Sequence, residues 1–403
     1  MARLTDPWML GPLEVPNRVL LAPLAGIGNW FVRLQAKRYG AGMAVSEMVS
    51  SHAIYYGNEK TCVEMLRIHP DERALGGGSG REGGGRERSG GESDGQESDG
   101  GESGGWESSG GGSGGWESRG GGSGGWESRD GWCGGGGPVS IQLFGENPAV
   151  MRSAAEHVAA RTAADAIDIN MGCPVPKVRK TGAGAGMLAN PDLAVAVARA
   201  AGEGAARAGR ELPITVKLRS GLRAGDESGF ALAHRLVEEA GVAAIAFHPR
   251  SAAVHHKGVP DYELAARLVA SLPAPVILTG GLSNAARARA AFEETGATAV
   301  MLARGSLGNP WLFRQLLGGP QGEPTREEIL GELSWTIDRA VEHLGEPRAT
   351  RYLRKFYPWY VARLGLDPAE AKRVGESLQN APTLGDARYT AARAALPLAA
   401  IPA

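Results

Sequence analysis

The sequence predicts an α/β protein in which a (β/α)8 TIM barrel is followed by a smaller C-terminal helical domain and interrupted by a disordered Gly/Ser-rich insertion. Three observations support the barrel. Short apolar runs alternate with Ala/Leu-rich stretches of helical period. There are eight such units, which favours a closed barrel over an open sheet. The alternative, a Rossmann sheet, needs Gly-x-Gly-x-x-Gly after its first strand, whereas Ala22 to Gly26 reads Ala-Pro-Leu-Ala-Gly.

The expected strands and helices fill residues 1–317, which we assign to the barrel. Each strand is a short apolar run that stops at glycine, proline or a polar residue. We expect strands at Val19–Ala22, Met43–Ser46, Val139–Leu143, Ala166–Asn170, Ile214–Leu218, Ala244–His248, Val276–Thr279 and Ala299–Ala303. We expect amphipathic helices at Pro148–Arg161, Pro191–Ala208, Ser228–Ala240, Tyr262–Ser271 and Asn284–Thr295.

The barrel is interrupted at residues 75–137, where the sequence collapses into Gly, Ser, Glu and Arg. A repeated Gly-Gly-Trp-Glu-Ser unit carries Trp106, Trp116 and Trp126. Such a segment cannot bury a core, because no apolar burial offsets the entropy lost on ordering it. It is therefore predicted to be a flexible acidic coil with no catalytic role. The alternative, in which the tryptophans stack on RNA bases, is disfavoured because the surrounding acidic charge repels phosphates.

Composition limits the partners and the compartment. The formal net charge is −1, so any nucleic-acid surface must be a local patch. No signal sequence and no run of membrane-spanning length is visible, which predicts a protein without a membrane partner. Cys62, Cys133 and Cys173 form no Cys-x-x-Cys pair and no Cys/His cluster, so no metal is expected. We expect a cytoplasmic monomer.

Asp168–Pro174 is the segment that most favours chemistry. An apolar strand runs into Asn170 and then into a Gly-Cys-Pro turn, which places the Cys173 thiol at the mouth of the barrel. A lone cysteine is more often buried filler, but its position after a strand favours a catalytic role. Other strand ends carry further polar or small residues, namely Pro23, Leu24, Ala25, Glu47, Gln142, Lys217, Arg219, His248 and Arg250.

The last two strands end in small turns that suit a phosphate. Thr279-Gly280-Gly281 follows the seventh strand and Ala303-Arg304-Gly305 follows the eighth. Backbone N–H groups in such turns can approach an anion, and the Arg304 guanidinium adds charge-assisted hydrogen bonds. Ordinary βα turns are the competing interpretation, since glycine is common there. A phosphate cradle at one end of the site, with Lys217, Gln142 and a thiol at the other, fits flavin mononucleotide (FMN).

These residues carry a resemblance to the tRNA-dihydrouridine synthases, most closely to the bacterial DusB-like branch. The Asp168–Pro174 motif, followed by a Gly-rich loop, is the most specific match. The resemblance covers about residues 7–311 outside the insertion and continues more weakly beyond. The other matching segments are Ala22–Gly26, Ser46–Met48, Val139–Gly145, Lys177–Val178, Gly182–Leu188, Val216–Arg219, His248–Ser251 and Arg304–Trp311.

The resemblance implies an enzyme that uses FMN, reduced by NADPH, to saturate the C5–C6 bond of a uridine in tRNA. Cys173 would be the general acid that gives a proton to C5, opposite the hydride delivered to C6. Asn170 and Arg250 would contact the substrate. The residues implied to bind the cofactor are Pro23, Leu24, Ala25, Gln142, Lys217, His248, Thr279, Gly280, Gly281, Ala303 and Arg304.

Residues 318–403 are expected to form a helical, tRNA-binding domain after the Gly318-Gly319-Pro320 linker. Helices are predicted at Arg326–Leu344, Arg348–Leu364 and Pro368–Gln379. Arg351, Arg354 and Lys355 alternate with aromatic residues, as in surfaces that follow a phosphate backbone. A helix packed by its aromatic residues, with solvated arginines outside, explains this pattern equally well from the residues alone.

Two other functions stay open at this stage. An FMN-dependent barrel oxidoreductase acting on a small molecule would not need the basic, aromatic C-terminal helices. A non-catalytic RNA-binding flavoprotein would keep the barrel without its activity.

Overall fold

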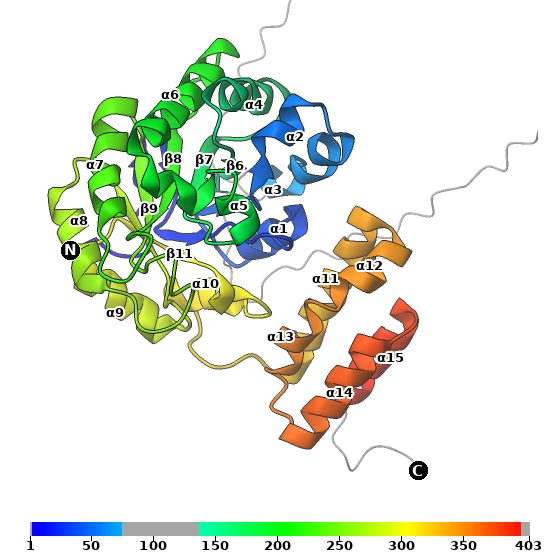
Figure 1. Cartoon of the computed structure of the whole chain (residues 1–403). Coiled ribbons are helices and arrows are strands. Elements are labelled where there is room, and N and C mark those ends of the chain that lie inside the picture. Colours follow the sequence, from blue (N-terminus) through cyan, green and yellow to red (C-terminus); the bar gives the residue numbers. More distant parts are fainter. Residues whose placement is uncertain (1, 75–136, 396–403) are drawn as a thin grey trace, which may run out of the picture. The chain divides into compact units, whose positions relative to one another are not determined.

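The computed structural model describes residues 2–74 and 137–395. Eight parallel strands close into a barrel, in the order β3 (Val19–Leu21), β4 (Met43–Val45), β6 (Val139–Phe144), β7 (Ala166–Met171), β8 (Ile214–Arg219), β9 (Ala244–His248), β10 (Val276–Thr279) and β11 (Ala299–Leu302). Pairing of β11 with β3 and of β4 with β6 closes the ring (Figure 1). The predicted barrel and its eight strands are confirmed. The predicted coil at residues 75–137 lies, apart from Gly137, outside the described residues.

The barrel core is closed at the amino ends of the strands. The short strands β1 (Trp8–Leu10) and β2 (Leu13–Val15) form an antiparallel hairpin. Trp8, Leu10 and Val15 pack in one cluster with barrel residues such as Leu20 and Ile277. The neighbours of Leu20 in β3, Val19 and Leu21, belong instead to the large cluster between strands and helices, as the alternation of side chains along a strand requires. A ligand pocket is therefore left to the carboxyl ends of the strands.

Helices on the outside of the ring connect successive strands (Figure 1). Asparagine or aspartate side chains cap several of them; Asn147, for example, accepts hydrogen bonds from the first backbone N–H groups of its helix. The helices of residues 148–161, 228–240 and 262–271 have the predicted bounds. The connecting helices are α1 (Trp30–Arg38), α2 (Ser51–Tyr55), α3 (Asp71–Ala74), α4 (Pro148–Arg161), α5 (Pro176–Arg179), α6 (Pro191–Arg207), α7 (Ser228–Ala240), α8 (Tyr262–Ser271) and α9 (Ala285–Thr295), and α10 (Trp311–Leu316) follows the last strand.

Shorter elements complete the barrel half. β5 (Val49–Ser50) pairs with the end of β6. A single-turn π-helix, η1 (Thr61–Met65), and two 3-10 helices, η2 (Gly184–Ala189) and η3 (Arg304–Ser306), lie in the connections. In the described part of the chain, no helix is long and apolar enough to span a membrane.

The C-terminal part consists of α11 (Arg326–Leu344), α12 (Glu346–Leu353), α13 (Tyr357–Val361), α14 (Pro368–Asn380) and α15 (Leu384–Ala395). The prediction of a single helix over Arg348–Leu364 is wrong, because the helix is interrupted between Leu353, where α12 ends, and Tyr357, where α13 begins. Pro358 lies in the first turn of α13, where its missing N–H costs nothing, but a continuous helix would leave the carbonyl of Arg354 without its donor. The last helix, α15, was not predicted.

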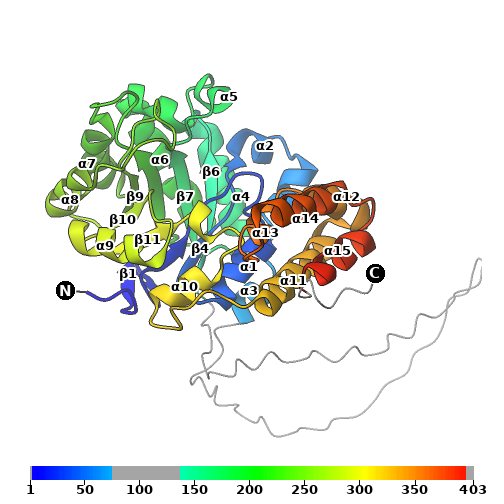
Figure 2. The same cartoon turned by 90° about the horizontal axis from the view of Figure 1, so that it is seen from below.

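A buried polar network joins these helices to α1 of the barrel. The Gln35 side-chain amide donates to Glu332 Oε1 at 2.8 Å and to the Tyr360 hydroxyl at 2.9 Å. Tyr39 donates to the second oxygen of Glu332 at 2.9 Å, and Arg38 pairs with that carboxylate at 3.1 Å. Figure 2 shows α11 and α13 beside α1. Because buried polar groups lose stability when a partner is removed, this network fixes the helices in one arrangement.

The two described segments that flank residues 75–136 meet at Lys37 in α1. The Lys37 ammonium group donates to the Glu72 carbonyl at 2.7 Å and also to the Gly137 carbonyl. Arg33 forms a buried ion pair with the Glu72 carboxylate at 2.8 Å. These contacts hold Glu72 and Gly137, which lie near the two ends of the described segments, against α1.

Candidate active site

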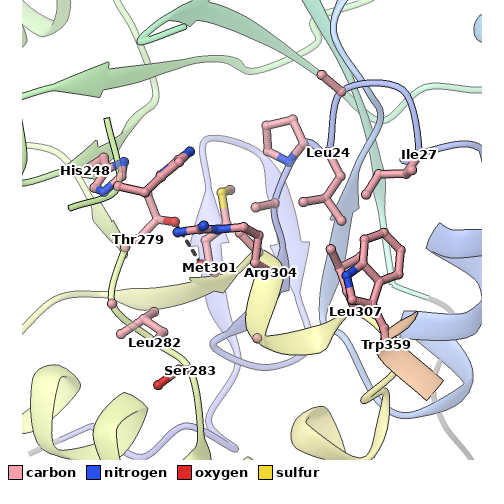
Figure 3. A pocket seen from close by; sticks show the side chains of 18 of the residues that line it. Leu24, Ile27, His248, Thr279, Leu282, Ser283, Met301, Arg304, Leu307 and Trp359 are labelled. Atoms are coloured by element: carbon pink, nitrogen blue, oxygen red, sulfur yellow. Dashed lines mark hydrogen bonds between the residues drawn. The ribbon is translucent and has the colours of Figure 1, made fainter. Parts of the chain in front are cut away.

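A cavity of about 1330 Å³ opens at the carboxyl ends of the strands. Figure 3 shows part of its lining, with His248 and Thr279 on one side and Leu24, Ile27 and Trp359 on the other. The structure brings every barrel residue expected at the site to this one pocket. These are Pro23, Leu24, Ala25, Gln142, Asn170, Cys173, Lys217, His248, Arg250, Thr279, Gly280, Gly281, Ala303 and Arg304.

A row of hydrogen-bonded side chains crosses three strands just below the pocket. Gln142, Asp168 and Thr215 are register neighbours on β6, β7 and β8. The Gln142 amide donates to one oxygen of Asp168 at 2.6 Å, and the Thr215 hydroxyl donates to the other at 2.5 Å. The side-chain oxygen of Gln142 (Oε1) in turn accepts a hydrogen bond from the side-chain amide of Asn170 at 2.9 Å. Asp168 therefore determines which way both amides point.

The side-chain oxygen of Asn170 (Oδ1), at the end of this row, holds the turn that carries the thiol. It accepts from the backbone N–H of Cys173 at 2.9 Å and from that of Gly172 at 3.2 Å. On the other side of the turn, Arg219 donates to the Gly172 carbonyl at 2.9 Å, and the Cys173 carbonyl accepts from Ala185 N–H at 3.0 Å. The backbone of Cys173 is thus held from several directions, with its side chain at the pocket.

The Asp168 carboxyl is buried without a cation among its hydrogen-bond partners. Burial raises its pKa to about 6, and the hydrogen bonds from Gln142 and Thr215 oppose that rise. The group is therefore mainly ionised at neutral pH. As an ionised carboxylate it can only accept, which is the property that orients the Gln142 amide.

Cationic side chains dominate the polar part of the pocket. Burial lowers the pKa of Lys217 to about 8, with the neighbouring Arg219 as the second cause. Burial also lowers the pKa of His248 well below its ordinary value, so this imidazole is neutral at pH 7. Among the described lining residues the one carboxylate is Glu323, which is paired with Arg363 at 2.9 Å. The pocket therefore favours an anionic ligand.

The turns after β10 and β11 depend on glycine. Gly280 has φ +100°, and a Cβ there would lie 2.3 Å from Cδ2 of His248. A Cβ on Gly305 would lie 2.5 Å from the Leu282 carbonyl oxygen. The Tyr262 hydroxyl, which sequence reasoning missed, donates to the Gly280 carbonyl at 3.0 Å. Side chains at these positions would block the close approach of backbone that forms the cradle.

Two further predicted polar residues, Thr279 and Arg250, also have hydrogen bonds within the protein. The Thr279 hydroxyl donates to the Met301 carbonyl at 3.0 Å. Arg250 donates to the Gly258 carbonyl at 2.6 Å, while its Nε is buried with no partner among the described residues. An unpartnered buried N–H costs stability unless a ligand accepts from it. Arg250 is thus a candidate contact to a bound anion.

The predicted tRNA-binding cations Arg351, Arg354 and Lys355 lie outside the cavity lining. Arg351 and Arg354 are exposed. The Lys355 ammonium donates to the Gly26 carbonyl at 3.2 Å and lies 4.7 Å from the ring centre of Tyr352. Their contact with RNA stays a prediction.

The residues at the strand ends fit FMN. The cradle at Gly280, Gly281 and Gly305, the unpartnered Arg250 Nε and the exposed Arg304 suit a phosphate. Lys217 and Gln142 supply donors for a polar ring edge. Within residues 2–74 and 137–395, no group of three His, Cys, Asp or Glu side chains could hold a metal ion.

A closed parallel barrel with buried cations and a thiol at the carboxyl ends of its strands has the architecture of an α/β-barrel enzyme. The family model described as dihydrouridine synthase (Dus) matches residues 127–389. The chain belongs to the dihydrouridine synthase family.

Individual relatives agree with this assignment. A probable tRNA-dihydrouridine synthase from Mycobacterium tuberculosis is 37% identical, over 87% of this chain and 76% of the mycobacterial protein. The tRNA-dihydrouridine synthase B of Pseudomonas aeruginosa is 28% identical, over 88% and 87% of the two chains. Among solved structures, a morphinone reductase aligns with a TM-score of 0.46 at 17% identity, over 81% of this chain and 92% of the other.

Proposed function

We propose that this protein is a tRNA-dihydrouridine synthase that reduces uridines in tRNA to 5,6-dihydrouridine with FMN and NADPH. The observation that carries the proposal is the position of Cys173, held by its backbone at the mouth of the same cavity that contains the anion cradle. Family membership supports the same activity. The proposed substrate implies that the enzyme acts in the cytoplasm.

When bound, FMN reduced by NADPH supplies the hydride that C6 of the uracil receives. Gly280, Gly281 and Arg304 would hold the phosphate, and Lys217 and Gln142 would hydrogen-bond the polar edge of the ring. Pro23, Leu24 and Ala25 line the same cavity from the loop after β3 and would pass along the ring. These assignments rest on the donor set of the pocket and on the resemblance.

Cys173 would supply the proton. Its Sγ–H would protonate C5 while C6 gains the hydride. The thiolate left behind regains a proton from water. Lys217 and Arg219 lie near enough for their charges to interact with the sulfur, which would stabilise the thiolate after transfer. Asn170 would orient the base, because its amide is fixed by Gln142.

The uracil must leave the RNA stack to reach a pocket of this depth. Arg351 and Arg354 would bind the tRNA backbone from the C-terminal helices, where they are exposed. Arg250 would contact the substrate or the cofactor phosphate inside the cavity. This division of labour gives the C-terminal helices a role that a small-molecule reductase would not need.

We predict that FMN affinity falls as the pH rises above about 8. A protonated Lys217 attracts the electron-rich edge of the ring, and bound FMN raises the pKa of this lysine above its free value of about 8. Binding then takes up a proton at high pH, so the affinity is level between about pH 7 and 8, where the FMN phosphate is mostly a dianion, and drops by up to about tenfold per pH unit above 8. Flavin fluorescence titrations from about pH 7 to about pH 9.5 measure this. The Lys217→Met variant should show a level profile; a drop of equal size in that variant would assign the effect to another group.

We also predict that replacing residues 75–136 by a short Gly-Ser linker leaves the unfolding temperature and the turnover on tRNA largely intact. Lys37 and the Arg33–Glu72 ion pair already hold the two flanks. Thermal unfolding and steady-state kinetics of the shortened protein check this. A large loss of turnover with an unchanged unfolding temperature would give the insertion a function.

The proposal is tested in cells. Dihydrouridine is mapped by position in tRNA from a strain with the gene, a deletion strain, and a deletion strain that carries the Cys173→Ala variant. We expect particular positions to lose dihydrouridine in the last two strains. Identical maps in all three would refute the proposed function.

A further inference from the structure

The C-terminal helices supply one wall of the pocket. Trp359 of α13 and residues 362–365 line the cavity together with barrel residues. Trp359 is half-buried and packs edge-on against Phe356, with 5.3 Å between ring centres. Figure 3 shows its ring next to Leu307, on the side of the pocket that carries Leu24 and Ile27. We call the side chains of Trp359, Leu307, Leu24 and Ile27 the apolar wall of the pocket.

The barrel is built to receive Trp359 closely. Gly308, with φ +58°, follows the apolar-wall residue Leu307, and a Cβ there would lie 2.7 Å from Cβ of Trp359 and 2.8 Å from its carbonyl carbon. Only glycine allows the backbone of α13 to approach this turn so tightly. The buried Gln35–Tyr360 hydrogen bond, one residue further along α13, fixes the helix on the same side.

A second set of contacts shapes the apolar wall from its other end. The loop that carries Leu24 and Ile27 is held at Gly26, whose N–H donates to the Glu47 carboxylate at 2.8 Å and whose carbonyl accepts from Lys355 at 3.2 Å. Next to it, Asn29 donates to the Tyr352 hydroxyl at 2.7 Å. Residues of the C-terminal helices therefore set both the position of Trp359 and the shape of the facing loop.

Polar and apolar side chains lie on opposite sides of the pocket. In the closed ring, β7 and β8 stand opposite β11 and β3. Asn170 and Lys217 at the ends of β7 and β8 thus face the apolar wall, whose Leu24 and Leu307 follow β3 and β11. The phosphate cradle lies at β10 and β11. A planar ligand in this pocket meets donors at one edge, apolar side chains at the opposite edge, and an anion site beside them.

We propose that Trp359, with Leu24, Ile27 and Leu307, forms a subsite for the dimethylbenzene edge of the flavin, so that the C-terminal helices complete the cofactor pocket. The inference rests on the proposed function, since it takes FMN as the ligand. FMN has the three features in the required arrangement: a polar pyrimidine edge, an apolar dimethylbenzene edge opposite it, and a phosphate on a flexible chain. Apolar ring carbons and methyl groups gain most from burial against an indole.

The test is a binding cycle between Trp359 and the two methyl groups. Dissociation constants are measured by flavin fluorescence for FMN and for the analogue without the 7- and 8-methyl groups, on the full chain. The unmodified protein should bind the analogue about tenfold more weakly than FMN, because two buried methyl groups are lost. Trp359→Ala should weaken FMN about tenfold and cut the penalty for the missing methyl groups to less than about threefold.

Two further variants keep the outcome decisive. Trp335→Ala removes a tryptophan of α11 that stacks on Arg38 and does not line the cavity, and it should keep the full methyl penalty. Trp359→Gln retains side-chain bulk if alanine impairs folding, and it should also reduce the penalty. An equal methyl penalty in the unmodified, Trp359→Ala and Trp359→Gln proteins would overturn the inference while FMN binding stands. A protein that binds neither flavin would instead refute the proposed function.

Discussion

Replacing Cys173 by alanine is expected to lower turnover on tRNA by about two to four orders of magnitude while FMN binding stays unchanged. In the proposed reaction the Cys173 thiol gives its proton to the face of the base opposite the hydride. The hydrogen bonds that hold this turn use the backbone N–H and carbonyl of Cys173, not its sulfur. Alanine therefore removes the proton and leaves the turn in place.

Single-turnover reduction of tRNA by protein whose bound FMN has been reduced beforehand measures the effect, because it separates the chemical step from NADPH oxidation. Cys62→Ala is the matched control. Cys62 is a free, half-buried cysteine in η1 and does not line the cavity, so its loss should leave the rate unchanged. Unaltered single-turnover rates for Cys173→Ala would refute the general-acid assignment.

Replacing Asp168 by alanine is expected to lower turnover by about a hundredfold, although this side chain does not line the pocket. Without the carboxylate, the Gln142 amide loses the acceptor that fixes its orientation. The Asn170 amide then loses its fixed acceptor, the side-chain oxygen of Gln142. As a result, the turn that carries Cys173 is held less firmly. Misplacement of a catalytic group by about 1 Å can cost about a hundredfold in rate. Asp168 is in this sense a positioning residue.

Asp168→Asn is the variant that separates positioning from charge. An asparagine can accept from Gln142 through its oxygen and donate to the Thr215 hydroxyl through its nitrogen. The hydrogen bonds from residue 168 to Gln142 and Thr215 are therefore kept. We expect turnover within about tenfold of the unmodified protein, and a rate of Cys173 alkylation that changes in Asp168→Ala but not in Asp168→Asn. Equal losses in both variants, with equal falls in unfolding temperature, would mean that Asp168 serves stability alone.

The barrel was predictable because its strands are buried on both sides. Runs such as Ala244–Phe247 and Val276–Leu278 are continuously apolar and end at polar residues, and they are separated by helices, several of which have an asparagine or aspartate cap visible in the sequence. The residues at the strand ends then had to converge, since parallel strands present their carboxyl ends to one face. The predicted pocket lining followed from this topology.

The remaining parts of the site depend on distances across the fold. Nothing in the sequence places Thr215 beside Asp168, because their contact comes from the register of β8 against β7. In the sequence Trp359 is one of several aromatic residues near the C-terminus, and its place at the pocket depends on Gly308 and on the break before α13. Nothing in the sequence places the Lys355 ammonium next to the Gly26 carbonyl either, to which it donates at 3.2 Å; its expected contact with RNA stays a prediction.

The most direct measurement uses the purified full chain, FMN, NADPH and tRNA transcribed without modifications, with dihydrouridine identified by position in the product. The proposed function predicts dihydrouridine at defined positions with the unmodified protein and almost none with Cys173→Ala, although both bind FMN. A protein that binds FMN and oxidises NADPH but forms no dihydrouridine in any tRNA would contradict it.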